Sequence, residues 1–349
     1  MNRLNHAPEI LELAEGLGVN GSNPVDGILD SCRRRIDGWV YEAGSVTDID
    51  SLELLVTKQL QMVFEEIRSD EDFDRLTDVY ARGKNDPVFA SMRFRFNDAE
   101  NPTFGALVRR NVGEDAPDRF VAVIDCRGDK LARRFFTRWH EIAHRLTTHA
   151  DQGASEPVYR SEHDPIEQLM DQIAGHVGFY EPIFDPAYRQ ASDGKLLLTF
   201  GTIEAIISGS FPAASFQATL FACTRRLLTP VIYLEAAIAH KKEVKRRLQS
   251  ASLFGEAPPR GELRAVKVVL NKAAQQERFT IPTNMRVPAG SVIHRIFDAE
   301  PQTNGDGQED LSQWESQGRT LESRSVAVDA RKVPNRVIAI VQPVGMAGI

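Results

Sequence analysis

The stretch RFFTRWHEIAHRL, at residues 134–146, decides how the rest of the sequence is interpreted. Its apolar residues recur every three or four positions, which is typical of an amphipathic helix with one buried face. One α-helical residue turns the chain by about 100°, so His140 and His144 lie one turn apart on the same face. The sequence therefore predicts a helix here that carries two imidazoles side by side.

Two imidazoles placed in this way can donate nitrogens to one metal ion at about 2.0–2.1 Å. Glu141 lies beside their face, where its carboxylate can take a proton from an activated water rather than bind the ion. A bound ion lowers the pKa of water toward about 7, which provides hydroxide at neutral pH. We therefore expect a catalytic metal centre with His140 and His144 as ligands and Glu141 as the general base.

A catalytic metal centre needs a third protein ligand, and the next predicted helix offers one. Asp164 and Pro165 form an N-cap and a first-turn proline, and Glu167 comes 23 positions after His144 (167 − 144). We expect Glu167 to be the third ligand and Asp171, one turn later, to accept a hydrogen bond from a ligand histidine. Two alternatives stay open: Glu167 only caps the helix, or Asp171 is the ligand.

Other polar residues near the motif are weaker candidates. His149 and His176 are turned about 140° and 180° away from the predicted ligands on their own helices. A group that stabilises an oxyanion is also expected at such a centre. Tyr159, His163 and Tyr180 are candidates by their proximity in sequence alone.

The composition is that of an ordinary globular protein. The 349 residues are 42% hydrophobic and 26% charged, and the formal net charge of −7 argues against nucleic-acid binding by the whole surface. No apolar run approaches the roughly 18–20 residues of a membrane span, and the first residues have no signal-peptide pattern. Cys32, Cys126 and Cys223 form no CxxC pair, so we expect reduced thiols in a cytoplasmic protein with no membrane partner.

Hydrophobic periodicity and turn residues predict an α+β fold for the part of the chain around the motif. Strands are expected at residues 89–96, 104–109 and 119–125. Helices are expected at residues 25–40, from 48 or 50 to about 69, at 70–81, from 128 through the motif, and from 164 to before Pro182.

The rest of the chain differs in composition. Residues 200–242 are rich in Ala, Leu and Ile, which predicts a compact helical bundle, although residues 214–218 with Arg225 and Arg226 are loosely similar to a helix-turn-helix. A basic run at 240–247 is interpreted as a solvated helix end, with nucleic-acid contact as the alternative. A linker is expected at residues 255–261 and a polar loop at 301–309. Strands are expected at residues 264–270, 292–297, 325–328 and 336–341.

These patterns predict three segments. The first, residues 1–190, would hold the metal centre. Residues 191–250 would form the helical bundle, which is helix-turn-helix-like in one interpretation. Residues 251–349 would form a small strand-rich C-terminal domain.

The motif and the helix after it resemble the ImmA/IrrE family of metallo-endopeptidases. Residues 134–146 are similar to that family's segment around its His-Glu-x-x-His motif. Residues 167–174, EQLMDQIA, are similar to its Glu-x-x-Ala-Asn/Asp-x-Phe-Ala pattern, with Met170 and Ile173 at two positions that differ. The family's Leu-Leu-Met-Pro ending is replaced by VGFY at residues 177–180, and the similarity covers about residues 50–185.

The resemblance implies a zincin-like catalytic domain, made of a small sheet and the motif helix, that holds Zn²⁺ or alternatively Mn²⁺. His140, His144 and Glu167 would be its ligands, Glu141 its catalytic residue and Asp171 the partner of a ligand. The implied activity is endopeptidase cleavage of a transcriptional repressor in the cytoplasm, often in a stress response. Some members of the family end in a sensor domain, so the strand-rich C-terminus is expected to be either such a domain or a short β-rich appendage. We expect the substrate peptide to pair with an exposed edge of the strand at residues 119–125.

Two other classes of function stay open. The chain could be a regulatory module that binds protein or DNA and keeps a structural or vestigial metal site. Chelation would then lower stability without abolishing an activity. A hydrolase of non-peptide substrates would use the same ligands, and a substrate screen separates it from a peptidase.

Overall fold

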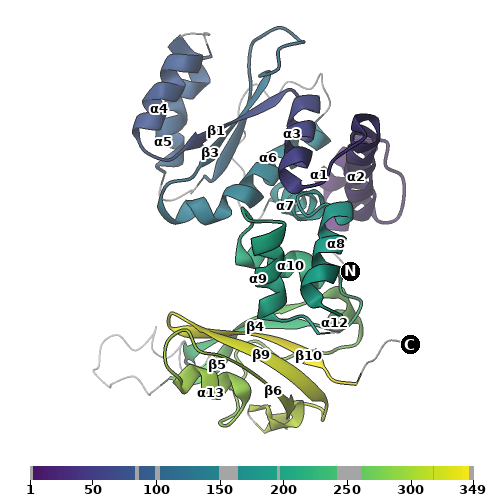
Figure 1. Cartoon of the computed structure of the whole chain (residues 1–349), viewed down its shortest axis with the longest axis vertical. Coiled ribbons are helices and arrows are strands. Elements are labelled where there is room, and N and C mark those ends of the chain that lie inside the picture. The colour runs from purple at the N-terminus through teal and green to yellow at the C-terminus, as the bar shows by residue number, and fades with distance from the viewer. Residues whose placement is uncertain are drawn as a thin grey trace. The chain divides into compact units, whose positions relative to one another are not determined.

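The chain folds into two compact units of mixed α+β structure. The computed structural model describes residues 3–82, 86–98, 103–148, 164–194, 197–241, 261–316 and 318–345. The first unit comprises residues 1–190 and 205–222, and the second comprises residues 191–204 and 223–349 (Figure 1). No helix within these described ranges combines the length and apolar character that crossing a membrane requires.

The elements up to residue 192 include the three strands of a small sheet. In chain order they are η1 (Arg3–His6), α1 (Pro8–Gly16), α2 (Pro24–Ala43), α3 (Ile49–Gln59), β1 (Met62–Ile67), α4 (Glu71–Leu76), the π-helical η2 (Thr77–Arg82), η3 (Pro87–Ser91), α5 (Met92–Phe96), β2 (Gly105–Arg109), β3 (Phe120–Asp125), η4 (Gly128–Arg133), α6 (Arg134–Thr147), α7 (Pro165–Val177) and α8 (Glu181–Ser192).

The sheet of the first unit has the strand order β1-β3-β2. β3 lies parallel to β1 and antiparallel to β2, and all its residues are buried. Val121 and Val123 pack into a core with residues of α4, η2, η3 and α5. Side chains alternate along a strand, so Phe120, Ala122 and Ile124 face the other side, where α6 packs.

Salt bridges fix α6 to the sheet and to α3. Arg134 and Arg138 both pair with Glu66 of β1, and Arg138 also pairs with Glu53 of α3. The Arg138 guanidinium carbon lies 4.0 Å from the centroid of the Phe64 ring, a cation–π contact. The first turns of α6 are therefore held from both sides before the motif begins.

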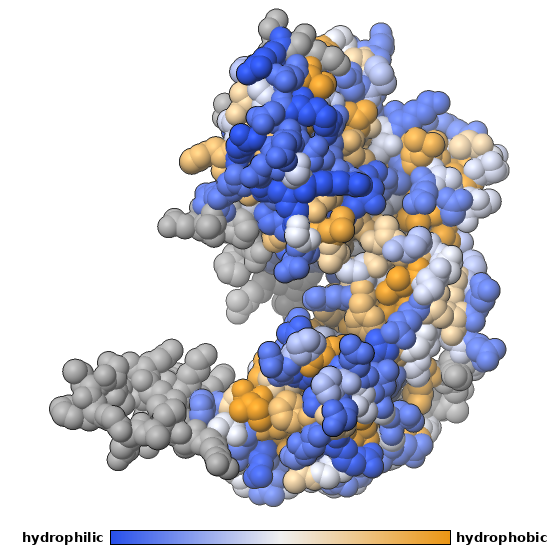
Figure 2. All heavy atoms as spheres, turned by 60° about the vertical axis from the view of Figure 1, so that its left-hand side comes forward, coloured by the Kyte–Doolittle hydropathy of each residue, from blue (hydrophilic) through white to orange (hydrophobic). Residues whose placement is uncertain are grey.

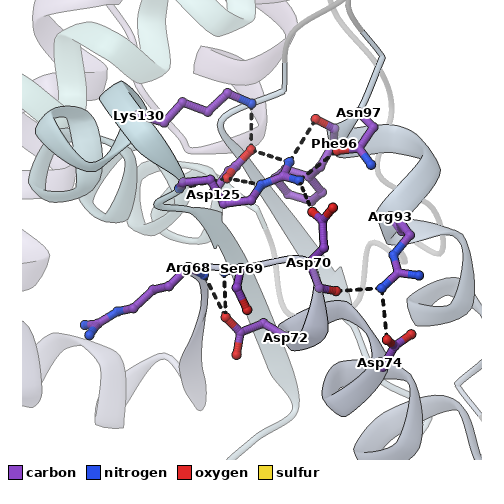
Figure 3. A network of polar contacts seen from close by, with 11 residues as sticks. Arg68, Ser69, Asp70, Asp72, Asp74, Arg93, Phe96, Asn97, Asp125 and Lys130 are labelled. Atoms are coloured by element: carbon purple, nitrogen blue, oxygen red, sulfur yellow. Dashed lines mark hydrogen bonds and ion pairs between the residues drawn. The ribbon is translucent and has the colours of Figure 1, made fainter.

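A polar network fixes the connection from β3 to α6 (Figure 3). Asp125, at the end of β3, accepts hydrogen bonds from Arg127 at 2.9 Å and from Lys130 at 2.6 Å. Arg127 also donates to Asp70 at 2.7 Å and to Asn97 at 2.8 Å. Burial raises the pKa of the Asp125 carboxyl, but the hydrogen bonds from these two cations outweigh burial and leave the pKa below its ordinary value.

α7 begins as its first residues predict. The Asp164 side chain accepts a hydrogen bond from the Ile166 backbone N–H at 2.7 Å, and Pro165 occupies the first turn. α7 packs along α6 and also contacts α1 and α2. Gly178, just after α7, permits a close approach to α6, because a Cβ there would lie 2.8 Å from Trp139 Cγ.

The second unit is built on a five-stranded antiparallel sheet of order β5-β4-β10-β9-β6. One face of the sheet packs with α13 around Trp314 and Ile293. α9 (Phe200–Gly209) and α10 (Phe216–Arg226) contribute residues to both units. The remaining elements are β4 (Ile232–Ala239), β5 (Glu262–Leu270), α12 (Lys272–Gln276), α13 (Val292–Asp298), β6 (Asn304–Asp310), η5 (Leu311–Gln313), β7 (Glu315–Ser316), β8 (Arg319–Thr320), β9 (Ser325–Val333) and β10 (Arg336–Pro343).

Two predicted strands are helical, and burial explains both errors. In residues 89–96 the buried side chains are Phe89, Met92 and Phe96, at helical spacing, whereas Phe94 is 82% exposed. The apparent alternation of that stretch is therefore coincidental, and η3 and α5 form instead. Residues 292–297 form α13, which Ser291 caps by accepting a hydrogen bond from the His294 N–H.

Three other segments form strands where the sequence predicted a helix or a loop. The helix expected to reach residue 69 ends at Gln59, Gln61 takes a φ of 53°, and β1 follows. Residues 232–239, expected within the helical bundle, form β4, whose burial between two strands hides any alternation. The expected polar loop at 301–309 contains β6, where Gly305 and Gly307 leave room for α13.

The surface of the first unit is largely hydrophilic in the view of Figure 2. Exposed large apolar side chains occur singly on separate elements, for example Tyr41 on α2, Leu54 on α3 and Phe94 on α5. Isolated apolar residues of this kind are normal on a soluble surface. Cys32, Cys126 and Cys223 are buried free thiols.

Candidate metal centre

α6 and α7 bring three of the predicted residues together. His140 and His144 lie one turn apart on α6, with ring centroids 4.9 Å apart. Glu167 lies in the first turn of α7, which packs along α6. Among the residues that the structure describes, these three form the group whose ligand atoms lie close enough to hold a metal ion, all within 4.8 Å of one another.

We call His140, His144 and Glu167 the triad. The distances between their donor atoms suit an ion with tetrahedral coordination. His140 Nε2 lies 3.1 Å from both His144 Nε2 and Glu167 Oε2, and His144 Nε2 lies 3.6 Å from Glu167 Oε2. Donors about 2.0–2.1 Å from an ion in tetrahedral geometry are about 3.3–3.4 Å from one another. The three side chains therefore need almost no rearrangement to coordinate one divalent ion. Imidazole and carboxylate ligands accept several such ions, Zn²⁺ and Mn²⁺ among them.

Glu167 does more than cap its helix. Asp164 satisfies the Ile166 N–H at the start of α7, while the Glu167 carboxylate oxygen faces the two imidazoles. Burial raises the pKa of Glu167, but its hydrogen bonds with His140 and His144 outweigh burial and hold the pKa far below its ordinary value. The carboxylate is thus ionised at neutral pH, as a metal ligand must be.

Asp171 orients one of the two imidazoles. Its Oδ1 lies 2.9 Å from His140 Nδ1, while the other ring nitrogen of His140 faces Glu167. A carboxylate at Nδ1 favours the tautomer that carries its proton there and leaves Nε2 free to bind a cation. Asp171 Oδ1 contacts Nδ1, and Asp171 is not among the three residues whose ligand atoms converge in the described part of the chain.

Two carboxylates around His140 create a negative environment. Burial lowers the pKa of His140, but its hydrogen bonds with Asp171 and Glu167 outweigh burial and raise the pKa to about 10. The surroundings therefore favour positive charge at this point of α6. A site for a divalent cation requires the same electrostatic condition.

Glu141 is buried beside the triad, against the start of β2. The side chain is only 5% exposed, and burial raises its pKa even though the nearby histidines oppose the shift. Gly105 is close enough that a Cβ at that position would lie 2.4 Å from Glu141 Oε1. Sequence reasoning missed this contact, although a glycine at the start of a strand is a known sign of close approach.

Tyr180 and His176, two further candidates near the motif, lie outside the triad. The Tyr180 hydroxyl donates a hydrogen bond to Asp37 of α2 at 2.6 Å, so it is engaged away from the imidazoles. His176 lies outside the group of converging ligand atoms. His149, Tyr159 and His163 lie outside the described residues.

The expected substrate edge is wrong. Residues 119–125 contain β3, the central strand, which pairs with β1 on one side and β2 on the other. β3 therefore has no free edge for a peptide. β2 is an edge strand of this sheet in the described part of the chain, and it is the strand whose first residue, Gly105, abuts Glu141.

In the second predicted segment, the connection between the two helices is longer than the turn of a helix-turn-helix motif. α9 ends at Gly209 and α10 begins at Phe216, so six residues (210–215) separate them. The turn of a helix-turn-helix usually has about 3–4 residues. Arg225 and Arg226 lie in the last turn of α10. Of the basic run at 240–247, all but the first two residues lie outside the described residues.

Comparisons with known proteins add little to this geometry. No model of a protein family matches the sequence, and no curated protein matches it. Among solved structures, a Mycobacterium tuberculosis transcriptional regulator is similar over 92% of this chain and 77% of its own, with a TM-score of 0.41 and 12% identity. A likeness at this level assigns neither a fold nor a function.

Proposed function

We propose that this chain is a metal-dependent endopeptidase with a zincin-like catalytic domain of the ImmA/IrrE type. The observation that carries the proposal is the convergence of His140, His144 and Glu167, with Glu141 buried alongside. Zn²⁺ is the proposed ion, because it binds imidazole and carboxylate ligands more tightly than Mn²⁺ does. The resemblance in sequence supplies the substrate class, a transcriptional repressor cleaved in the cytoplasm.

In the proposed reaction each side chain has one task. His140, His144 and Glu167 would hold a divalent cation, which would supply Lewis acidity toward the scissile carbonyl and the attacking water. Glu141 accepts the proton of that water at its carboxylate and passes it to the leaving amine. Burial raises the pKa of Glu141 and so makes it a stronger base than a solvated glutamate. Asp171 holds the His140 ring in the orientation that the ligand needs.

The edge of β2 is the proposed binding surface for the substrate. An extended peptide could form backbone hydrogen bonds along this edge without a demand on its side chains. Gly105 begins the strand and touches Glu141, so a peptide paired there would pass beside the general base. This arrangement replaces the strand at residues 119–125 as the expected platform.

The substitution Glu141→Gln tests the proposal. The variant should keep the metal content of the wild type, because Glu141 is not a ligand, and should lose cleavage of repressors encoded beside this protein. Glu12→Gln, the same change on the exposed face of α1, is the matched control and should cleave normally. Full cleavage by Glu141→Gln would remove Glu141 from the reaction. Chelation that lowers only the unfolding temperature would identify a structural metal site instead.

A further inference from the structure

Four arginines gather near the end of α6 that follows the motif. Arg145 is on α6, Arg35 on α2, Arg109 at the end of β2, and Arg119 directly before β3. Arg109 is paired with Phe120 in the register of β2 and β3, and the Arg145 guanidinium carbon lies 4.1 Å from the centroid of the Phe120 ring. We call these four side chains the arginine cluster.

The Phe120 ring contacts two of the cations. Arg145 lies over it, and the Arg119 guanidinium carbon is 5.9 Å from the same centroid. Arg145 is 6% exposed and Arg119 is 8% exposed, so both charges are largely removed from water. Arg109 is half-buried and Arg35 is exposed, which gives the cluster an open side.

The cluster has no carboxylate partner among the residues that the structure describes. Arg145 donates to the Thr148 carbonyl at 3.0 Å and Arg35 donates to the Leu146 carbonyl at 3.2 Å, which uses one N–H group of each. Within the described ranges, the buried Nε of Arg145 has no hydrogen-bond partner. The main-chain carbonyls at the end of α6 therefore satisfy only a small part of the donor capacity.

A neighbouring arginine shows how the same fold normally compensates a buried cation. Arg110 follows Arg109 directly, is 2% exposed, and forms ion pairs with Asp86 and Asp118. The cluster shows no such pairing in the described part of the chain. Uncompensated charges of one sign at such positions are costly to folding unless an anion joins them.

We propose that the arginine cluster is an anion site that binds a phosphoryl group. Arginine presents a planar fork of donors that matches phosphate oxygens, and a lysine cluster would lack this geometry. A phosphoryl group carries about −1.5 to −2 charge and three acceptor oxygens, so it compensates several arginines at once, as a single carboxylate does not. The site is separate from the metal triad and does not depend on the proposed peptidase activity.

Thermal unfolding with added inorganic phosphate tests the site. Phosphate should raise the unfolding midpoint of the full-length protein by roughly 5 °C near saturation, relative to chloride at the same ionic strength. The measurement is repeated with a chelator, which removes any phosphate bound through a metal at the triad. No rise in the presence of the chelator would overturn the proposal.

Substitutions locate the effect. Arg145→Met should abolish the rise with phosphate and, in phosphate-free buffer, should not lower the midpoint, because it removes repulsion. Arg109→Gln changes a less buried member and should weaken phosphate binding at least 10-fold, which keeps the test decisive if Arg145→Met fails to fold. Arg82→Gln, an exposed arginine paired with Asp78, should leave the rise unchanged. An unchanged rise in Arg109→Gln would refute the assignment.

Two probes separate the sources of such a group. Glycerol phosphate represents a small phosphate ester, and a short phosphoserine peptide represents a modified protein segment. Tighter binding of either one, measured by calorimetry and lost in Arg109→Gln, supports the site and names the source. If both probes bind and Arg109→Gln weakens neither, the assignment of the site to the arginine cluster is contradicted.

Discussion

The contact between Gly105 and Glu141 can be tested by the addition of one methyl group. In Gly105→Ala the new Cβ would lie 2.4 Å from Glu141 Oε1 and 2.7 Å from Thr137 Cγ2. Real Cβ atoms essentially never come closer than 3.0 Å to another heavy atom. Both neighbours are buried on α6, so either the start of β2 or the Glu141 side chain must move.

The size of the movement follows from these distances. Ordinary contact begins at 3.4 Å, so the carboxylate and the strand must separate by about 1.0 Å (3.4 − 2.4). A displacement of about 1 Å at a reacting group can lower a rate roughly 100-fold. Overpacking of a buried site also costs about 1–3 kcal/mol in the free energy of unfolding. The three atoms nearest to this Cβ belong to Glu141 and Thr137 and not to a metal ligand, so we expect metal affinity to stay within about 3-fold.

The assay compares three quantities for the same variants: cleavage rate, bound metal and the free energy of unfolding. Gly113→Ala is the matched control, because a Cβ at Gly113, in the connection between β2 and β3, meets nothing within 4 Å. Gly105→Ala should lose cleavage with its metal retained, and Gly113→Ala should keep both. Cleavage at the wild-type rate in Gly105→Ala, with a stable fold, would refute the placement of Glu141 against β2.

Two further predictions concern carboxylates. Asp171→Ala should weaken metal binding about 10–100-fold, as measured by competition with a chromophoric chelator, with little change in the stability of the metal-free protein. An affinity equal to that of the wild type would contradict the role of Asp171 at His140 Nδ1. Asp125→Asn should cost about 3 kcal/mol at pH 7, because it removes the charge of a fully buried carboxylate from its ion pairs with the partly exposed Arg127 and Lys130. Because the pKa of folded Asp125 lies below 3.8, its contribution is present above about pH 4 and is lost as the pH falls. Urea unfolding at pH 7 and pH 3 should therefore show a smaller pH dependence for Asp125→Asn, and an equal dependence would refute this assignment.

Local sequence patterns were enough to predict the residues of the triad. His140 and His144 are one helical turn apart, and a helix fixes that relation whatever surrounds it. Asp164 and Pro165 mark the start of α7, which places Glu167 in the first turn and Asp171 one turn on. That the two helices pack against each other could not be derived from either pattern. The expectation that Glu167 joins the two histidines rested on the need for a third ligand and was supported by the family resemblance, and the structure brings the side chains together.

The strands show why the rest was less predictable. β1 and β4 depend on pairing with partners that are distant in sequence, and neither stretch alternates clearly enough to oppose a helix. β6 is a polar edge strand whose glycines accommodate α13, a contact that no local pattern contains. The order β1-β3-β2 is likewise a tertiary property. An edge for substrate binding can be assigned only after that order is known.

The register of α6 gives four of its residues four different neighbours. Trp139 packs against Gly178, His140 faces α7, Glu141 meets β2, and Arg145, one turn on from Glu141, lies over a ring of β3. Successive residues point about 100° apart, so a single helix can serve a buried core, a metal triad and an anion site. Because one rigid element carries all three, an anion that displaced Arg145 would also shift the adjacent His144. Metal affinity measured with and without phosphate should then differ, and the two ligands must alter each other's binding by the same factor.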